Sequence, residues 1–270
     1  MLYFPPCKIN LGLLVTAKRS DNYHDIETVF YPVPLCDALE FVEADEFGFQ
    51  ISGIELDSDV EDNLVVKAYR LLQADYHLPN IKIHLHKNIP SGAGLGGGSA
   101  DASCMLTALN SYFQLNLSVS ELQNYALQLG SDCPFFIHPE ASFATGRGEI
   151  LHRIAVNLSG YYLVVVKPPI HVSTSKAYSF MSPTAPKESL VDILQLPIED
   201  WRGRVINQFE DYVFHVAPEV AEVKTKLYDL GASFALMSGS GSAVYGLFKE
   251  APQLAGIFSD NYAVFTQKLD

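Results

Sequence analysis

The chain has 270 residues, of which 48% are hydrophobic and 18% are charged, and its formal net charge is −13. This negative charge disfavours nucleic acid and anionic membranes as partners, because both select for basic surfaces. No stretch approaches the roughly 18 consecutive apolar residues that suggest a membrane span, so the composition predicts a soluble globular protein with two lobes.

The N-terminal residues and the cysteines indicate the compartment. Met1 to Lys8 lacks the basic start and the long apolar stretch of a secretory signal, which predicts a cytoplasmic protein. The four cysteines are too scattered for a zinc knuckle or a redox pair and too few for a disulfide scaffold. We therefore expect Cys7, Cys36, Cys104 and Cys133 to be reduced thiols in the core.

The first half begins with a β-rich region and then a helix. Residues 9–49 contain alternating apolar residues and many strand formers, interrupted by turn residues at 18–22. Asn63 to Ala74 has apolar residues at helical spacing. Ile81 to His86 alternates apolar and polar residues, which predicts a strand with one buried face.

A glycine-rich run from Pro90 to Asp101 joins this strand to a second predicted helix. Glycine permits positive φ and close approach, so successive amides can converge on an anion, and the following helix adds the positive end of its dipole. The run therefore predicts a phosphate-binding loop of a nucleotide site. A flexible turn without a ligand is the alternative reading.

Two common nucleotide motifs do not fit this run. Gly92-x-Gly94-x-x-Gly97 matches the dinucleotide fingerprint, but Ser111 and Tyr112 stand about 20 positions on, where that motif needs an acidic residue. A Walker loop needs Lys-Ser or Lys-Thr after its last glycine, and neither is present.

Several later elements are also predicted. Ser118 and Glu121 form a capping box before a helix that Gly130 closes. Tyr161 to Val166 is a short apolar run typical of a buried strand, and Glu219 to Leu230 is a helix candidate. The segment from Ser238 to Ser242 is either a hairpin turn or a second glycine-rich functional loop.

Three separated segments together resemble the GHMP kinases, named for galactokinase, homoserine, mevalonate and phosphomevalonate kinases. They are Lys8 to Leu11, Pro90 to Ala102 and Leu236 to Tyr245. Asp21 to Thr28, Gly130 to Phe136, Val172 to Tyr178 and Asn207 to Glu210 are similar to further blocks of one branch, which phosphorylates a cytidine diphosphate sugar alcohol. The resemblance covers nearly the whole chain.

The resemblance implies an α+β fold of two lobes with the active site between them. Residues 1–157 would form an N-terminal lobe like domain 2 of ribosomal protein S5, carrying the glycine-rich loop, and residues 158–270 a ferredoxin-like C-terminal lobe. It also implies transfer of the γ-phosphate of ATP to the 2-hydroxyl of the sugar alcohol. The oligomeric state expected is a monomer or a weak homodimer.

The resemblance also implies roles for individual residues. Asp132 would take the proton of the hydroxyl, and Lys8 would hold that aspartate and the developing negative charge, as phosphoryl transfer requires. The spacing to Pro134 alone would make Asp132 a helix N-cap. Asn10 would meet the sugar alcohol, Tyr23 and Tyr178 would stack on the two faces of cytosine, and His24 would bond to its edge.

The same resemblance places ATP on the glycine-rich loop. The residues implied to bind it are Pro90, Gly92, Gly94, Leu95, Gly96, Gly97, Gly98 and Ser99, with Asn63, Leu64 and Lys87 near adenosine. Asn63 is also a good helix N-cap. Mg²⁺ would arrive with the nucleotide, and no protein metal site is expected.

Two positions depart from the family pattern. Many members have two adjacent serines after the loop glycines, whereas Ala100 follows Ser99 here, and Gln208 replaces a frequent aspartate in the block from Asn207 to Glu210. We interpret that block as structural. Homoserine kinase, a diphosphomevalonate decarboxylase-like lyase and a nucleotide-binding relative without turnover remain the alternatives.

Overall fold

The computed structural model describes residues 1–55 and 59–270, which form two compact units. The first unit comprises Met1–Lys8, Pro34–Ser91 and Gly96–Glu140, and the second comprises Ile9–Val33, Gly92–Leu95 and Ala141–Asp270. The units interleave along the chain. The division between residues 157 and 158 stays a prediction.

The sheet of the first unit has the strand order β1-β4-β6-β5. Its central strand β6 (Ile81–Lys87) pairs antiparallel with β4 (Ala38–Glu43) and parallel with β5 (Gly48–Gly53), while β1 (Leu2–Tyr3) adds to β4. Burial alternates along β6, so the predicted half-buried strand is confirmed.

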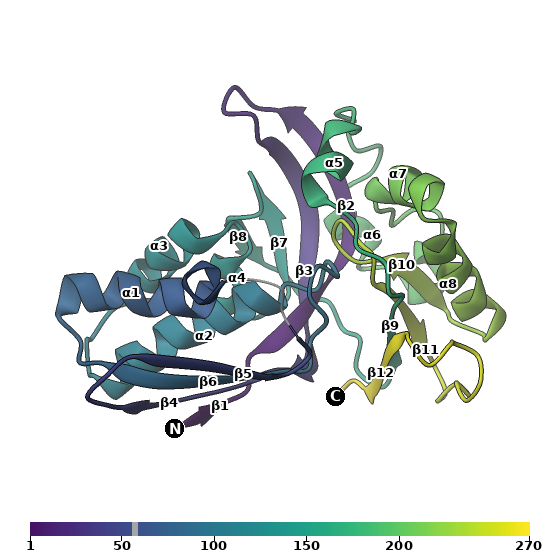
Figure 1. The fold of residues 1–270 in the computed structure, drawn as a ribbon. Helices are drawn as coiled ribbons and strands as arrows, with labels where there is room; N and C mark the ends of the chain where they lie inside the picture. Colours follow the sequence, from purple (N-terminus) through teal and green to yellow (C-terminus); the bar gives the residue numbers. More distant parts are fainter. Residues whose placement is uncertain (56–58) are drawn as a thin grey trace. The chain divides into compact units, whose positions relative to one another are not determined.

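Helices α1 (Leu64–Tyr76) and α2 (Gly97–Tyr112) cover one face of this sheet (Figure 1). Their apolar residues form the core of the unit with the sheet residues Leu39, Ile83 and Leu85. The 3₁₀ turn η1 (Val60–Asp62) precedes α1. The helix predicted from Asn63 is confirmed.

Two further helices complete the first unit. Helix α3 (Val119–Leu129) starts with both hydrogen bonds of the predicted capping box at Ser118 and ends at Gly130. The short helix α4 (Cys133–Ile137) follows, and the periodicity of the sequence does not predict it because it is little longer than one turn.

A second sheet has the order β2-β3-β7-β8. It is built from β2 (Pro6–Lys18), β3 (His24–Cys36), β7 (Ser142–Thr145) and β8 (Ile150–Arg153). The predicted turn between the first two strands is confirmed, with Asn22 in the left-handed region at φ 66°. This turn brings Tyr23 to the start of β3.

The third sheet, in the second unit, has the order β10-β11-β9-β12 and is antiparallel throughout. Its strands are β9 (Tyr162–Lys167), β10 (Phe234–Met237), β11 (Val244–Phe248) and β12 (Ala263–Lys268). The buried strand predicted at 161–166 is confirmed, and Ser238 to Ser242 is the hairpin connection between β10 and β11.

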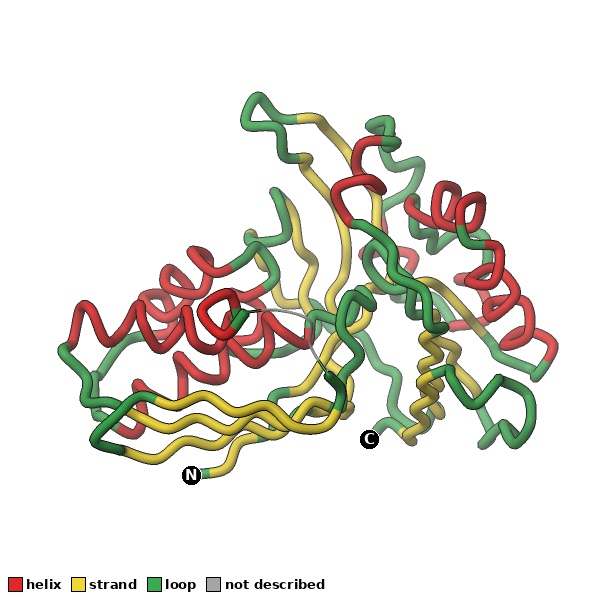
Figure 2. Tube along the Cα trace, in the orientation of Figure 1, coloured by secondary structure: helices red, strands yellow, loops and turns green. Residues whose placement is uncertain are grey.

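Helices α7 (Phe209–Val216) and α8 (Pro218–Asp229) follow one another beside this sheet (Figure 2). Their residues Phe209, Val213 and Val223 belong to the core that they form with it. The helix predicted from Glu219 is confirmed as α8. Three short elements lie before α7, namely α5 (Thr174–Ser179), α6 (Leu190–Ile193) and η2 (Ile198–Trp201). The helices and strands together confirm the α+β class.

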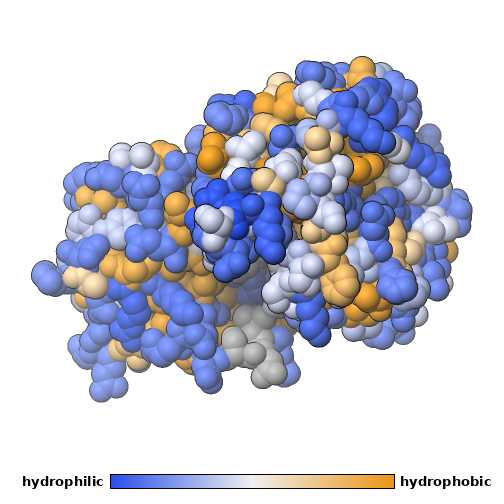
Figure 3. Space-filling view, turned by 90° about the horizontal axis from the view of Figure 1, so that it is seen from above, coloured by the Kyte–Doolittle hydropathy of each residue, from blue (hydrophilic) through white to orange (hydrophobic). Residues whose placement is uncertain are grey.

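The outer surface is mostly hydrophilic on the face that Figure 3 displays, with apolar atoms in separate groups. Phe180 and Val216 of the second unit are among the exposed large apolar residues. None of the helices in residues 1–55 and 59–270 is long and apolar enough to cross a membrane.

Candidate active site

The glycine-rich run is a tight turn that opens helix α2. Gly92, Gly94 and Gly96 have φ angles of 59°, 76° and 72°, so L side chains would be strained at these positions. A Cβ on Gly94 would lie 2.0 Å from the carbonyl oxygen of Ser238. A glycine is therefore required at position 94, because the β10–β11 hairpin leaves no space for a side chain there. The sequence alone did not predict this close approach.

Gly98 differs from the other loop glycines, because a Cβ there would meet only Leu64 Cδ1, at 3.8 Å. It is exposed and lies in the first turn of α2. The first amides of a helix have no partners within the helix and carry the positive end of its dipole. The open side of this turn is therefore suited to an anion such as a phosphate group.

A Gly98→Ala variant separates helix stability from ligand binding. Alanine is favoured over glycine in a helix by roughly 0.5–1 kcal/mol, and the site has space for the methyl group, so we expect a higher melting temperature. The same methyl group projects from the first turn of α2, so we expect weaker ATP binding. Thermal melting and calorimetric titration with ATP measure the two effects. A stabilised variant with unchanged ATP affinity would place the phosphates elsewhere.

Lys8 and Asp132 form an ion pair in the first unit. Lys8 Nζ lies 3.5 Å from Asp132 Oδ2, and the lysine side chain is 3% exposed whereas the aspartate is 35% exposed. A Cβ on Gly96 would lie 3.3 Å from Lys8 Cε, so the lysine stem passes beside the start of α2. The structure thus brings the two predicted catalytic residues together at the predicted phosphate loop.

Asp132 occupies the position before α4 without capping that helix. Its backbone is in the right-handed helical region, and its side chain makes no cap hydrogen bond. Ser103 Oγ of α2 donates to the carbonyl oxygen of Cys133 at 2.7 Å, which holds the start of α4 against α2. The carboxylate is therefore free of the structural role that the spacing alone suggested.

Burial lowers the pKa of Lys8 from its ordinary value of 10.5, and the nearby Asp132 opposes this shift. If the ammonium is needed for turnover, kcat should fall with rising pH before 10.5 is reached. Over the same window the unfolded chain binds more protons than the folded one, so this lysine makes stability rise with pH. As pH rises through this window, kcat should therefore fall. The free energy of unfolding should rise relative to that of Lys8→Met. A kcat that stays level up to pH 10.5 would contradict this.

Lys87, predicted near adenosine, is buried at the end of β6 between two carboxylates. Its Nζ pairs with Asp37 and lies 2.7 Å from Asp101 Oδ2. Burial alone would lower the pKa of Lys87, but the two carboxylates raise it above the ordinary value. A Cβ on Gly97 would lie 3.5 Å from this Nζ. The Lys87 ammonium therefore lies next to the first residue of α2. Its contact with adenosine stays a prediction.

The remaining residues predicted at ATP have identifiable structural positions. Asn63 caps α1, since its Oδ1 accepts from the amide of Val65 at 2.9 Å. Leu64 faces Gly98, as described above, while Leu95 is buried and Pro90 half-buried. Ser99 is hydrogen-bonded to the thiol of Cys133.

Asn10 is buried in the second unit and is held by three neighbours. Its side-chain Nδ2 donates to Thr28 Oγ1 at 2.8 Å. Its backbone N–H donates to Ser238 Oγ at 3.2 Å, and Tyr245 Oη donates to its backbone carbonyl oxygen at 3.0 Å. These bonds fix both the backbone and the side-chain amide of Asn10. Its contact with the sugar alcohol stays a prediction.

The three residues predicted at cytosine lie in the second unit. His24 stacks on Tyr178 with ring centroids 5.2 Å apart and planes 21° apart. Tyr178 also meets Phe209 edge to face at 4.8 Å. Tyr23 is 53% exposed, and the guanidinium of Arg147 lies 4.9 Å from its ring centroid. Sequence reasoning missed Arg147, because the contact joins turns far apart in the chain.

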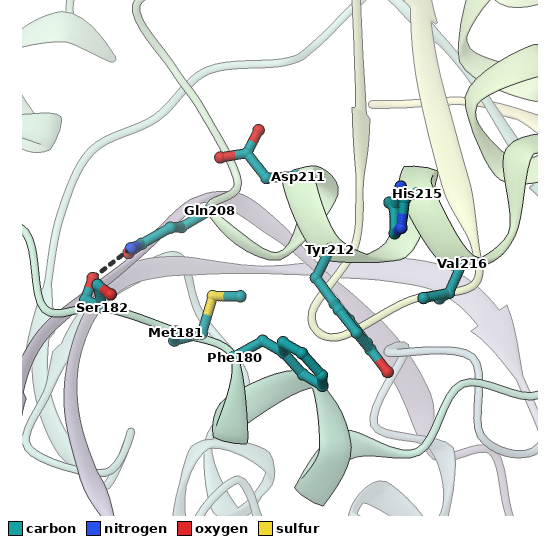
Figure 4. Close-up of a pocket in the computed structure, with 8 residues that line it drawn as sticks. All are labelled: Phe180, Met181, Ser182, Gln208, Asp211, Tyr212, His215 and Val216. Atoms are coloured by element: carbon teal, nitrogen blue, oxygen red, sulfur yellow. Dashed lines mark hydrogen bonds between the residues drawn. The ribbon is translucent and has the colours of Figure 1, made fainter.

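A separate pocket of about 600 Å³ in the second unit contains none of the predicted site residues. Figure 4 shows Phe180 and Tyr212 with parallel rings, and the Gln208 side chain bonded to Ser182. Its lining residues are Phe180, Met181, Ser182, Gln208, Asp211, Tyr212, His215 and Val216.

The block from Asn207 to Glu210 holds the β10–β11 hairpin in place. Asn207 Nδ2 donates to the carbonyl oxygens of Met237 and Gly239, both at 2.7 Å, and Glu210 Oε1 accepts from the amide of Met237 at 3.0 Å. Gln208 Oε1 accepts from the amide of Val15 at 2.8 Å. These bonds are consistent with the structural role expected for this block.

An α+β fold in which a glycine-rich turn opens a helix beside a buried lysine paired with a part-exposed aspartate is typical of a class of small-molecule phosphotransferases. Residues 63–140 match the model of the GHMP kinases N terminal domain, and residues 198–264 match that of the GHMP kinases C terminal domain. The chain belongs to the GHMP kinase family.

Two similar relatives have the name 4-diphosphocytidyl-2-C-methyl-D-erythritol kinase. The protein of that name from Azobacteroides pseudotrichonymphae is 53% identical over 260 residues, covering 96% of this chain and 97% of the relative. That from Bacteroides thetaiotaomicron is 51% identical over 253 residues, covering 92% of each.

Solved structures agree with the predicted two-lobe fold class. A crystal structure of 4-(cytidine 5′-diphospho)-2C-methyl-D-erythritol kinase superposes with a TM-score of 0.77 at 35% identity, covering 92% of this chain and 90% of the other. A homoserine kinase from Cytophaga hutchinsonii gives a TM-score of 0.64 at 19% identity, covering 91% of this chain and 85% of the other. At that identity the second match shows the fold alone.

Proposed function

We propose that this chain transfers the γ-phosphate of ATP to the 2-hydroxyl of 4-(cytidine 5′-diphospho)-2-C-methyl-D-erythritol, giving the 2-phosphate and ADP, in the non-mevalonate route to isoprenoid precursors. The observation that carries the proposal is the Lys8–Asp132 pair, whose carboxylate is part exposed and makes no helix cap. The names of relatives that are 53% and 51% identical over nearly their whole length supply the substrate.

In the proposed reaction, Asp132 accepts the proton of the 2-hydroxyl as the bond between that oxygen and the γ-phosphorus forms. The bond from the phosphorus to the β-phosphate oxygen breaks, and ADP leaves. Lys8 holds the carboxylate in place and offsets the negative charge that develops on the transferring group. This matches what phosphoryl transfer demands of a protein, because positioning and charge stabilisation supply most of the catalysis.

The second unit supplies the proposed substrate contacts. Tyr23 would stack on cytosine with Tyr178 on the other face, and His24 would hydrogen-bond to the base edge. Asn10 would bind the erythritol hydroxyls. The support is that Tyr23, His24 and Tyr178 lie in one unit with His24 and Tyr178 in ring contact.

ATP would bind at the first turn of α2, with its phosphates on the amides from Gly96 to Ser99 and its adenosine near Asn63, Leu64 and Lys87. The open side of Gly98, with the Leu64 side chain beside it, favours this placement. Mg²⁺ would come with the nucleotide and neutralise part of the phosphate charge. The described residues hold no group of three or more His, Cys, Asp or Glu side chains that fits a metal ion. Ser99 is the hydroxyl residue that directly follows the last loop glycine.

The organisation of the protein completes the proposal. We place an N-terminal lobe at residues 1–157 and a C-terminal lobe at 158–270, which the two family matches at 63–140 and 198–264 support. We further propose a cytoplasmic protein that is a monomer or a weak homodimer.

Comparing candidate acceptors tests this function. The protein is incubated with ATP and the cytidine diphosphate substrate, homoserine or diphosphomevalonate, while ADP and carbon dioxide are followed. We expect rapid ADP release with the first compound alone and no carbon dioxide with any. Faster turnover of homoserine, or release of carbon dioxide from diphosphomevalonate, would replace the proposed function with the corresponding alternative.

A further inference from the structure

The ring of Tyr23 has a cation on one face. The guanidinium carbon of Arg147 lies 4.9 Å from the ring centroid, within the range of a cation–π contact. The ring is nevertheless 53% exposed. One face is therefore covered by a charged, planar group, while the other remains open to a flat ligand.

Arg147 is itself fixed by the turn between β7 and β8. Its amide donates to Glu149 Oε2 at 2.5 Å, and its Nε lies 3.6 Å from Glu149 Oε1. The preceding residue, Gly146, accepts from the amide of Ile26 at 2.7 Å. Since Ile26 follows His24 on β3, this bond ties the Arg147 turn to the strand that begins beside Tyr23.

Tyr23 has few other restraints. It closes the β2–β3 turn through its carbonyl oxygen, which accepts from the amide of Arg19 at 2.9 Å, and its own amide donates to Asp21 Oδ1 at 3.1 Å. Both bonds hold the backbone, and neither restrains the ring. A side chain that is free before binding loses entropy when it stacks, which weakens binding.

We propose that Arg147 is a positioning residue for recognition of the base, whose guanidinium fixes the Tyr23 ring so that one face is presented to cytosine. The inference rests on the proposed function, because it takes Tyr23 to be a stacking surface for the substrate. Arg147 acts through the ring and makes no contact with the base through its side chain. Its loss therefore affects binding of the cytidine substrate and leaves binding of ATP and the chemical step unchanged.

The test is steady-state kinetics on Arg147→Met, which keeps an unbranched apolar stem and removes the charged guanidinium. We expect KM for the cytidine substrate to rise about two- to fivefold, the equivalent of one exposed cation–π contact, with kcat and KM for ATP unchanged. Arg147→Lys keeps a cation near the ring and should restore most of the affinity. Arg202→Met is the matched control, since Arg202 lies 4.1 Å from the ring centroid of Tyr228 and has no place in the proposed site.

A double-mutant cycle shows whether Arg147 acts through Tyr23. In a Tyr23→Phe background the ring remains, so Arg147→Met should raise KM by the same factor as in the unmodified protein. In a Tyr23→Leu background it should have no further effect. An equal rise in the leucine background would mean that Arg147 binds the substrate directly, for example at its diphosphate, and would overturn the proposal, as would an unchanged KM in Arg147→Met. Absence of turnover of the cytidine substrate by the unmodified protein would instead overturn the proposed function.

Discussion

Replacing Asp132 by asparagine is expected to lower kcat by about a hundredfold or more, the scale on which a lost general base acts. The amide keeps the size of the side chain but cannot accept the proton of the hydroxyl. Because Asp132 makes no cap bond to α4 and is 35% exposed, the fold and the affinity for ATP should persist. Single-turnover kinetics, thermal melting and calorimetry with ATP measure the three quantities.

Asp211→Asn serves as the matched control for this experiment, because Asp211 lies near the start of another short helix, α7, and outside the proposed site. It should leave kcat unchanged. A folded Asp132→Asn protein that turns over at the normal rate would show that Asp132 is not the base.

Replacing Lys8 by methionine should lower kcat by roughly 10²–10³-fold, as the loss of a preorganised charge in an active site does. Stability should not fall with it. Lys8 is 3% exposed and Asp132 is 35% exposed, so removing the ammonium ends the cost of burying a charge, while water can still solvate the carboxylate. We therefore expect an unfolding free energy that is unchanged or higher.

The control for Lys8→Met is Lys67→Met, which removes a lysine from an exposed pair, Lys67 Nζ to Asp62 Oδ1 at 2.9 Å. Such surface pairs contribute about 0–1 kcal/mol, and turnover should be unaffected. An inactive Lys8→Met protein that also unfolds much more easily would point to a structural lysine, and an active one would exclude the proposed role.

The longer elements could be predicted because their signals are local. The alternation in β6, the capping box of α3 and the apolar run of β9 all lie within a few residues. Helices α4 to α7 are too short to show a period, and prolines interrupt the segment that holds α5 and α6. Their positions depend on tertiary packing, such as the ring of Tyr178 against Phe209.

The glycine loop shows what the sequence could not supply. The sequence predicts that its glycines expose backbone to a ligand, yet Gly94 is needed because the Ser238 carbonyl oxygen would lie 2.0 Å from its Cβ. That neighbour is far away in the chain. A larger residue at Gly94 therefore tests the packing of the hairpin, and Gly98 is the position that tests the ligand.

The ion pairs of the candidate site also depend on partners that are distant in the sequence. The spacing to Pro134 favours an N-cap at Asp132, and only the fold reveals Lys8 at 3.5 Å. For Lys87, the partners Asp37 and Asp101 come from different elements. The resemblance to a family named Lys8 and Asp132 as a pair, which residue spacing alone could not do.

Phosphorus NMR of the products is the most direct test of the central claim, that Asp132 and Lys8 direct phosphoryl transfer to the 2-hydroxyl. The protein is mixed with equal amounts of ATP and the cytidine diphosphate substrate. We predict one new phosphate monoester on the C2 oxygen for each ADP formed, and none with Asp132→Asn over the same time. ADP with free inorganic phosphate, a phosphate on another oxygen, or the same product at the same rate from Asp132→Asn would contradict it.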